Sequence, residues 1–161
     1  MQKETILVVA TDEEYQKVKG RTRLKIIQTG IGYGNVINAL KNLDAKKIKI
    51  YNVGYAGSNL LKRGTLVKVK NSYNHHENAQ FDEKLYTLNG TTDCYTSSDF
   101  VLSTKIQQPV VFDMELNAIC SFGFEVESYK IVSDNLSMQE YEEADFEKAW
   151  VEVLNLINKG N

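Results

Sequence analysis

Two carboxylates stand where they could do acid–base or binding chemistry. Asp134 follows an apolar run that predicts a strand, in the segment 132–135 (VSDN). An acid there could protonate a leaving group if partial burial raises its pKa, although an N-cap or Asx turn would explain the same position. Glu115 stands in 112–116 (FDMEL), at the predicted start of a helix. It could accept two hydrogen bonds from a vicinal diol, or it could only complement the helix dipole.

A glycine-rich turn offers a candidate anion site. Gly30, Gly32 and Gly34 follow a predicted strand and open a predicted helix, where backbone N–H groups can receive an anion. The segment is not the dinucleotide fingerprint GxGxxG, because position 35 is Asn, and the chain has no GxxxxGK[ST] phosphate loop. A tight turn alone also explains these glycines, so both interpretations stay open.

Histidine and cysteine do not indicate a metal centre. The two histidines, His75 and His76, are adjacent, and adjacent residues of a strand point to opposite faces. Cys94 and Cys120 form no CxxC pair, which argues against a disulfide framework or a zinc knuckle. Because no third ligand stands at a suitable spacing, we expect no metal. We also expect no organic cofactor.

Length and charge exclude several classes of protein. The 161 residues fit one domain, residues 1–161, with a real core. Nineteen Lys and Arg against twenty-one Asp and Glu give a formal net charge of -2, whereas nucleic-acid binding needs a basic surplus. No apolar run approaches the ~18 residues of a membrane span, and the first residues lack a signal-peptide pattern. We therefore expect a cytoplasmic protein with neither a nucleic-acid nor a membrane partner.

Strands that alternate with helices are expected to position these residues. Short apolar runs predict strands at 4–10, 24–28, 47–53, 65–70, 85–88, 110–111 and 129–132. Apolar residues at helical spacing and N-cap types predict helices over 12–19, 34–43, 113–122 and 138–158. The long last helix is expected to bury Phe146, Trp150, Val153, Leu154 and Ile157. Gly54 and Gly57 are expected to stop the third strand, and 71–90 to be mostly irregular.

This alternation predicts an α/β sheet with parallel strands at its centre. In an open α/β sheet the ligand lies outside the carboxyl ends of the strands. Four segments rich in small or polar residues fall there: 11–14, 29–34, 54–58 and 133–137. The sequence therefore predicts a small-molecule pocket between them.

Six segments form an ordered pattern over nearly the whole chain. They are 6–14 (ILVVATDEE), 29–40 (TGIGYGNVINAL), 52–57 (NVGYAG) with Gly64 and Thr65, 97–102 (SSDFVL), 112–118 (FDMELNA) and 131–135 (IVSDN). In this order they resemble the nucleoside phosphorylase and nucleosidase superfamily, most of all the 5′-methylthioadenosine/S-adenosylhomocysteine nucleosidases. The resemblance implies a three-layer α/β/α fold with a mixed, mostly parallel central sheet, and a homo-oligomer. The chain is shorter than typical members, mainly between Asn71 and Asp113.

The resemblance also implies which residues do the chemistry. Asp134 would hydrogen-bond or protonate the purine at N7, and Ser133 would support its orientation. Glu13 or Glu14 would position the attacking water, although an ungapped match places Tyr15 at that point. By default, both glutamates are solvated residues of a short helix.

Further residues are implied as substrate contacts. Glu115 would hold the ribose 2′ and 3′ hydroxyls, with Met114 packed beneath the sugar. Lys130 stands where the family has an Arg, which keeps the charge but loses the bidentate fork. At the base, the resemblance implies stacking by Phe100, with Val101 as its backbone neighbour, and a pocket wall at Ala56 and Gly57.

The implied reaction is hydrolysis of an N-glycosidic bond. Phosphorylases bind phosphate with arginines and a small hydroxyl residue near the glycine turns. Arg21, Arg23 and Arg63 lie outside those turns, and the bulky Tyr55 stands at the hydroxyl position. We therefore expect a nucleosidase acting on adenosine-type nucleosides such as 5′-methylthioadenosine or S-adenosylhomocysteine. A purine nucleoside phosphorylase, an inactive nucleoside-binding module and an assembly subunit are the alternatives.

Overall fold

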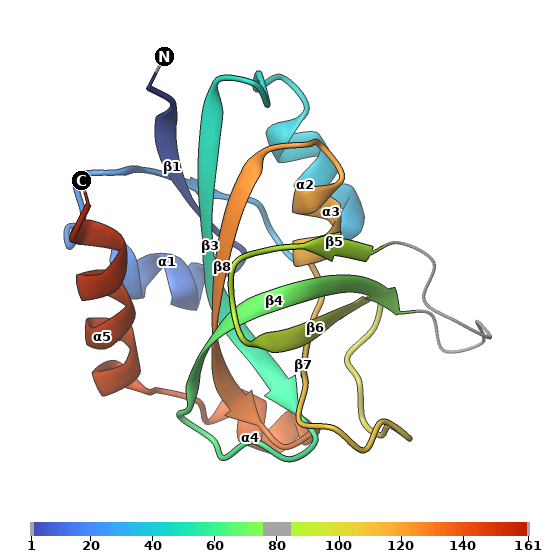
Figure 1. Cartoon of the computed structure of the whole chain (residues 1–161). Coiled ribbons are helices and arrows are strands. Elements are labelled where there is room, and N and C mark those ends of the chain that lie inside the picture. Colours follow the sequence, from blue (N-terminus) through green and yellow to red (C-terminus); the bar gives the residue numbers. More distant parts are fainter. Residues whose placement is uncertain (1, 76–84, 161) are drawn as a thin grey trace.

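The computed structural model describes residues 2–75 and 85–160 (Figure 1). Its strands are β1 (Glu4–Val9), β2 (Lys25–Gln28), β3 (Ile48–Ser58), β4 (Leu66–His75), β5 (Leu85–Thr87), β6 (Thr92–Ser97), β7 (Val111–Asp113) and β8 (Glu125–Asp134). Its helices are α1 (Asp12–Val18), α2 (Tyr33–Leu40), α3 (Leu116–Cys120), α4 (Met138–Glu142) and α5 (Glu147–Asn158). None of these described helices is both long and apolar enough to cross a membrane.

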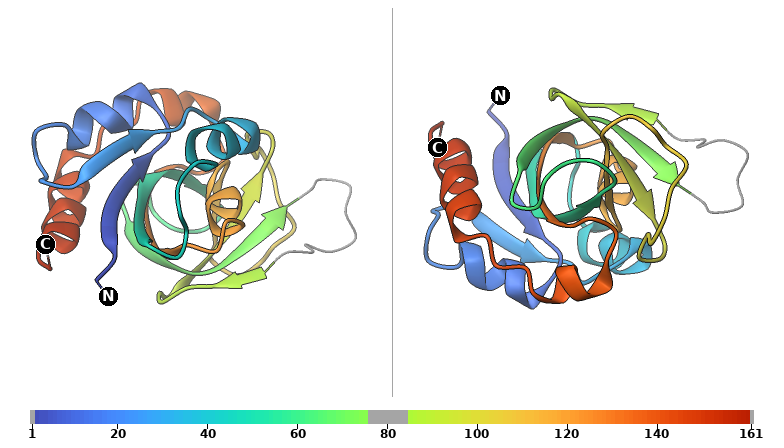
Figure 2. Two further views of the ribbon diagram at one scale, coloured as in Figure 1. Left: turned by 90° about the horizontal axis from the view of Figure 1, so that it is seen from above. Right: turned by 90° about the horizontal axis from the view of Figure 1, so that it is seen from below.

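All eight strands belong to one sheet, which is mixed and mostly parallel. Its order is β2-β1-β3-β7-β6-β4-β5, and β8 pairs with both β3 and β4. The strands β3, β8, β4, β6 and β7 therefore close into a ring, and Figure 2 shows them curving around a common centre. The antiparallel pairs are β3–β7, β4–β5 and β4–β8, and the other pairs are parallel. This confirms the predicted sheet type.

Helices cover both faces of the sheet, as expected for three layers (Figure 1). Strand β1 shows the sequence basis, because its side chains alternate between two apolar cores. Ile6 and Val8 pack in the core with α2 and α3, whereas Leu7 and Val9 pack in the core with α1 and α5. A parallel strand buried on both faces is apolar at every position, which is the pattern that predicted this strand.

The predicted end of the third strand is wrong. Strand β3 runs through Gly54 and Gly57 to Ser58, and it pairs with β8 along most of that length. Its glycines are therefore inside a strand, where they leave space for side chains that approach the backbone. The region from Asn71 onward is also more regular than predicted, because β4 continues to His75 and β6 was not expected at all.

The predicted helix over 138–158 is two helices. Helix α4 ends at Glu142 and α5 begins at Glu147. Phe146 turns inward between them, where its ring packs against the second core and lies 3.0 Å from a Cβ position at Gly64. The break therefore comes from a tertiary contact, since 143–146 contain neither Gly nor Pro. Trp150, Val153, Leu154 and Ile157 are buried as predicted.

Candidate active site

A cavity of about 390 Å³ opens at the carboxyl ends of β1, β3, β7 and β8. All four of the predicted loop segments contribute to its wall, as do the β7–α3 turn and α4. Eight of the sequence-predicted site residues line it: Glu14, Ala56, Gly57, Phe100, Met114, Glu115, Ser133 and Asp134. The chain therefore brings most of the predicted residues to one place.

Glu14 is held at the cavity by the start of α1. Thr11 caps the helix and forms a capping box with Glu14, which turns the glutamate back toward the end of β1. Its Oε1 accepts from the backbone N–H groups of Ala10 (2.9 Å) and Thr11 (3.1 Å), and its Oε2 accepts from that of Tyr55 (2.8 Å). Burial raises the pKa of this carboxyl, although these hydrogen bonds and the nearby Lys130 act in the opposite direction.

Glu13 and Tyr15 have different surroundings from Glu14. Glu13 is exposed and lines a smaller hollow next to the main cavity, together with Thr11 and Tyr141. Tyr15 packs against the core under α1 and α5. Of these three candidates for the water-positioning residue, only Glu14 lines the main cavity.

Asp134 is the last residue of β8 and is fully buried. Its Oδ1 accepts from the Ser133 hydroxyl at 2.6 Å, and its Oδ2 accepts from the backbone N–H of Leu136 at 3.0 Å. Burial raises the pKa of this carboxyl. A Cβ at Gly57 would lie 2.9 Å from Asp134 Oδ2, so the glycine in β3 makes room for the acid.

Glu115 meets the glycine turn before α2. Its Oε2 accepts from the backbone N–H of Gly32 at 2.9 Å, at the N-terminus of that helix. Gly32 has a φ of 94°, which side-chain-bearing residues rarely adopt. The two interpretations of the turn thus combine, because the tight turn presents an N–H group that donates to a carboxyl of the chain itself. Burial, and next the charge of Asp113, raise the pKa of Glu115 to about 8.

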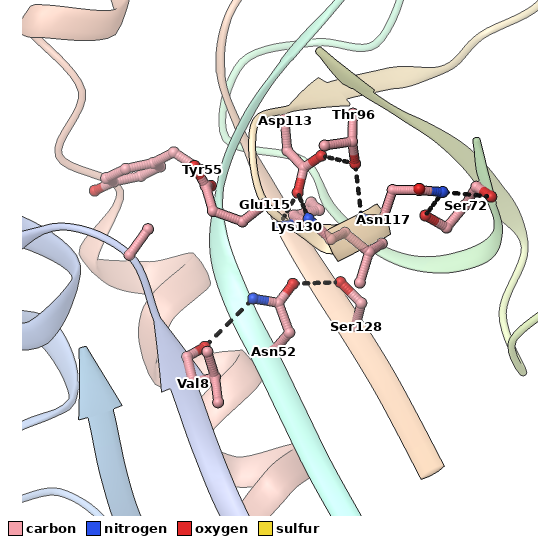
Figure 3. Close-up of polar contacts among 12 residues, drawn as sticks. Val8, Asn52, Tyr55, Ser72, Thr96, Asp113, Glu115, Asn117, Ser128 and Lys130 are labelled. Carbon is pink, nitrogen blue, oxygen red and sulfur yellow. Dashed lines mark hydrogen bonds and ion pairs between the residues drawn. The ribbon is translucent and has the colours of Figure 1, made fainter. Parts of the chain in front are cut away.

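Lys130 does not line the cavity but lies beneath it, fully buried. Its Nζ donates to Asp113 Oδ2 at 2.9 Å, and Asp113 also accepts from the Thr96 hydroxyl (2.6 Å) and from the backbone N–H of Leu116 (2.8 Å) (Figure 3). Although desolvation disfavours its charged form, Asp113 and other nearby acids raise the pKa of Lys130, and Lys130 lowers that of Asp113. The expected substrate contact at Lys130 is thus replaced by an ion pair that fixes the turn carrying Glu115.

Aromatic and apolar side chains complete the wall. The rings of Phe100 and Tyr141 meet edge to face, with centroids 5.6 Å apart, and both line the cavity. Met114 lies next to Glu115 on the wall, and Val101 lines an adjoining hollow that also touches Asp134. Ala56 and Gly57 contribute the strand β3 side.

Two functional positions were missed by sequence reasoning. Asp113 was read only as part of its motif and as the start of a predicted helix, although an acid after the apolar run 110–112 and a lysine next to the apolar residues 131–132 were signals of a buried pair. Tyr141 was not singled out, because it fell within the single long helix predicted over 138–158, which the structure divides into α4 and α5.

Tyr55 does not fill the cavity with its ring, contrary to expectation. The ring packs edge to face against Trp150 of α5, and its hydroxyl accepts from Trp150 Nε1 at 3.0 Å. Because side chains alternate along a strand, Tyr55 points to the opposite face from Ala56. What Tyr55 gives the site is its backbone N–H, which donates to Glu14.

His75 is not among the residues that line the cavity. His75 packs edge to face against Tyr95 and Phe112, with centroids 5.7 and 5.8 Å away. His76 lies outside the described residues, as does most of the predicted irregular segment.

No protein-family profile and no curated protein sequence matches the chain. Solved structures do match its fold. A 5′-methylthioadenosine/S-adenosylhomocysteine nucleosidase from Chlamydia trachomatis bound to 5′-methylthioadenosine is 12% identical, with a TM-score of 0.78 and coverage of 99% of both chains. An S-adenosylhomocysteine nucleosidase from Streptococcus pyogenes in complex with 5-methylthiotubericidin is 15% identical, with a TM-score of 0.78 and coverage of 99% of this chain and 98% of that one.

A related fold comes with a different named activity. The futalosine hydrolase of Helicobacter pylori is 12% identical, with a TM-score of 0.75 and coverage of 94% of this chain and 97% of that one. At these identities the likeness concerns the fold, which agrees with the sheet order and layers described above. The chain therefore has the fold of the nucleoside phosphorylase and nucleosidase superfamily, in the form seen in the 5′-methylthioadenosine/S-adenosylhomocysteine nucleosidases.

Proposed function

We propose that the chain is a nucleosidase, which hydrolyses the N-glycosidic bond of adenosine-type nucleosides such as 5′-methylthioadenosine or S-adenosylhomocysteine. The observation that carries the proposal is that four buried carboxyls line one cavity of about 390 Å³: Asp113, which is paired with Lys130, and Glu14, Glu115 and Asp134. A cavity of this size, with a few polar groups of shifted pKa in a largely apolar wall, is typical of a small-molecule active site. The ligands named for the matching structures support this substrate class.

Asp134 is the proposed acid at the base. Cleavage places negative charge on the departing purine, and a protonated carboxyl that donates to N7 stabilises it. The raised pKa of Asp134 favours the protonated form that this step needs. Ser133 orients the carboxyl, while Phe100, Ala56 and Gly57 are the proposed neighbours of the base.

Glu115 and Glu14 are the proposed groups at the sugar and the water. Ionised Glu115 would accept from the 2′ and 3′ hydroxyls and stabilise positive charge on the ribose, with Met114 beneath it. Glu14 already accepts three backbone hydrogen bonds, and a carboxylate offers about four acceptor positions. The remaining position suits a water molecule, and the raised pKa of Glu14 suits a general base.

Water is the proposed nucleophile rather than phosphate. Phosphate binding calls for arginine or lysine, and none lines this cavity among the described residues. Five residues with carboxyl side chains line the same cavity, Glu14, Asp99, Asp113, Glu115 and Asp134, and those that are ionised would repel a dianion. Lys130 supports this choice, since its charge is directed to Asp113.

The proposal is tested by purine release from 5′-methylthioadenosine, S-adenosylhomocysteine, adenosine and inosine, each with and without phosphate. We expect release that ignores phosphate, and we expect Asp134→Asn to lower kcat by about 10²–10⁴-fold because it removes the acid. Asp44→Asn is the matched control, since Asp44 is exposed in the turn before β3. Unchanged release by Asp134→Asn would refute the assigned mechanism.

Two other results would replace the proposal. Release that requires phosphate would identify a phosphorylase. No release, combined with a nucleoside-dependent rise in Tm, would identify a binding module.

We further propose that residues 1–161 act as one domain, in the cytoplasm, as a homo-oligomer. Both cysteines, Cys94 and Cys120, are free and buried, which is usual in a reducing compartment. Ile31 and Met138 are apolar and exposed at the cavity wall, a position that a second copy could cover. Sedimentation of the purified chain would decide the oligomeric state.

A further inference from the structure

Arg63 lies outside the cavity, in the connection between β3 and β4, yet it contacts two segments that form the cavity wall. Its Nε donates to the backbone carbonyl of Ser133 at 3.0 Å, and its Nη2 donates to that of Glu140 at 3.0 Å. Its Nη1 also lies 3.8 Å from Glu140 Oε2. The guanidinium therefore bridges the end of β8 and helix α4.

Both acceptors belong to functional parts of the wall. The Ser133 carbonyl is part of the peptide group that joins Ser133 to Asp134, so Arg63 fixes the plane from which the acid projects. Glu140 lies in α4, the helix that carries Met138 and Tyr141 into the wall. Because a guanidinium is planar and its donors have a fixed geometry, it holds both carbonyls in one arrangement.

The segment between these two acceptors depends on such contacts. Leu136 has a φ of 64°, an uncommon conformation for a residue with a side chain. Helix α4 has five residues and none of them is buried, so core packing does not fix it. Asn135 provides a second polar link, since its side chain donates to the carbonyls of Ser58 and Leu61.

We propose that Arg63 is a positioning residue, which aligns Asp134 for proton transfer and holds α4 against the cavity. The inference rests on the proposed function, in which Asp134 protonates the leaving base. Arg63 acts through the Ser133–Asp134 peptide and through α4, and it is not assigned any contact with substrate.

The test compares two leaving groups in Arg63→Met, Arg63→Lys and Arg23→Met. A purine of 5′-methylthioadenosine needs protonation, whereas 4-nitrophenolate leaves 4-nitrophenyl β-D-ribofuranoside without it. We expect Arg63→Met to lower kcat on 5′-methylthioadenosine by about 10²-fold, as misplacement of a catalytic group does, with KM changed by less than about threefold. The aryl riboside should be cleaved within about twofold of the wild-type rate.

Arg63→Lys and Arg23→Met are the comparison variants for Arg63→Met. Arg63→Lys keeps the charge but not the fork, so we expect a smaller loss than in Arg63→Met. Arg23→Met removes an exposed arginine of the α1–β2 connection and should match the wild type on both substrates. An equal loss on the two substrates, or no loss on either, would overturn the proposal.

Amide hydrogen exchange separates this inference from the proposed function. In Arg63→Met we expect faster exchange confined to residues 133–142, with Arg23→Met unchanged, whether or not the chain cleaves either substrate. If the wild type releases no base, the proposed function fails, and this exchange pattern decides the role of Arg63. Unchanged exchange over 133–142 would show that Arg63 does not hold the segment.

Discussion

Glu13 and Glu14 are adjacent in the sequence but have opposite environments. The capping box at Thr11 turns Glu14 into the cavity, while Glu13, one position earlier in the helix, faces solvent. The acidic pair could be recognised from the sequence, but the choice between its members depends on where the helix begins. A shift of one residue in that start would exchange the two side chains.

Glu14→Gln tests this assignment. Both Glu14 oxygens accept from backbone N–H groups, so one of these donors would face the new amide N–H₂ group. We expect a loss of about 1–3 kcal/mol in the free energy of unfolding, together with loss of hydrolysis. Glu13→Gln is the matched control and should change neither quantity. Urea unfolding and purine release measure the two effects, and equal behaviour of the two variants would contradict the assignment.

The candidate acids could be located from the sequence, but their partners could not. Asp134 and Glu115 follow strands, and a ligand in this fold class lies at the carboxyl ends of strands. Lys130 was expected to contact substrate, because its charge was visible and its distant partner Asp113 was not. Sequence position shows which charged groups reach the end of a strand. Ion pairs between side chains of different strands decide which of these groups remain available to a ligand.

At the scale of elements, strand β3 is where the sequence was most misleading. Its glycines were read as stops, yet a Cβ at Gly54 would lie 2.8 Å from Glu14 Oε2, and one at Gly57 would lie 2.9 Å from Asp134 Oδ2. The glycines are therefore spaces for two carboxyls that arrive from other elements. Since those neighbours are remote in sequence, local turn propensity was the only available interpretation.

Gly57→Ala tests this role of the strand. The added methyl group would displace the Asp134 carboxyl, so we expect a fall in kcat of about 10²-fold in a chain that still folds. Gly34→Ala is the matched control, because no atom lies within 4 Å of its Cβ position and it stands in helix α2. The control should keep its activity and gain up to about 1 kcal/mol in the free energy of unfolding. Unchanged kcat in Gly57→Ala would show that the spacing at Asp134 is not critical.

Most helices and strands could be predicted because their apolar patterns are strong, as in β1, β2 and α1. The failures share a cause, which is that long-range contacts decide them. Polar β6 forms because β4 and β7 pair with it on either side, and 143–146 leave the helix because Phe146 enters a core. Neither pairing nor core entry has a local sequence signature.

For the molecule as a whole, the buried charges do not balance. Among the residues that the structure describes, Asp113 is paired with Lys130, and desolvation raises the pKa of the other three buried carboxyls, those of Glu14, Glu115 and Asp134. Such a set suits binding and proton transfer at the expense of stability, because the folded chain must keep these groups away from water. The cost should be visible in the pH dependence of folding.

We expect the free energy of unfolding to fall as pH rises from about 5 to about 8. In this window the unfolded chain has released these carboxyl protons, while the folded chain, with raised pKa values, retains part of them, so rising pH favours unfolding. Each group contributes at most about 1.4 kcal/mol per pH unit. The other described groups with a shifted pKa titrate outside this window. The pKa values of Asp113, Glu127 and Glu147 are lowered from an already acidic value. Those of the shifted lysines, tyrosines and cysteines are raised from values that already lie above the window.

Glu115→Gln isolates the contribution of one of these carboxyls. Because the pKa of Glu115 is raised to about 8, its replacement by a neutral amide should flatten the decline and make the variant more stable than the wild type above pH 8. The same variant should lose nucleoside binding, since an amide cannot accept from both ribose hydroxyls with both of its ends. Urea unfolding followed by the fluorescence of Trp150, the single and buried tryptophan, measures the first effect at pH 5.5, 7 and 8.5. Glu13→Gln is the exposed control. If the pH slope of Glu115→Gln is as steep as that of Glu13→Gln, Glu115 is already ionised in the folded chain, and the decline in stability must come from other groups.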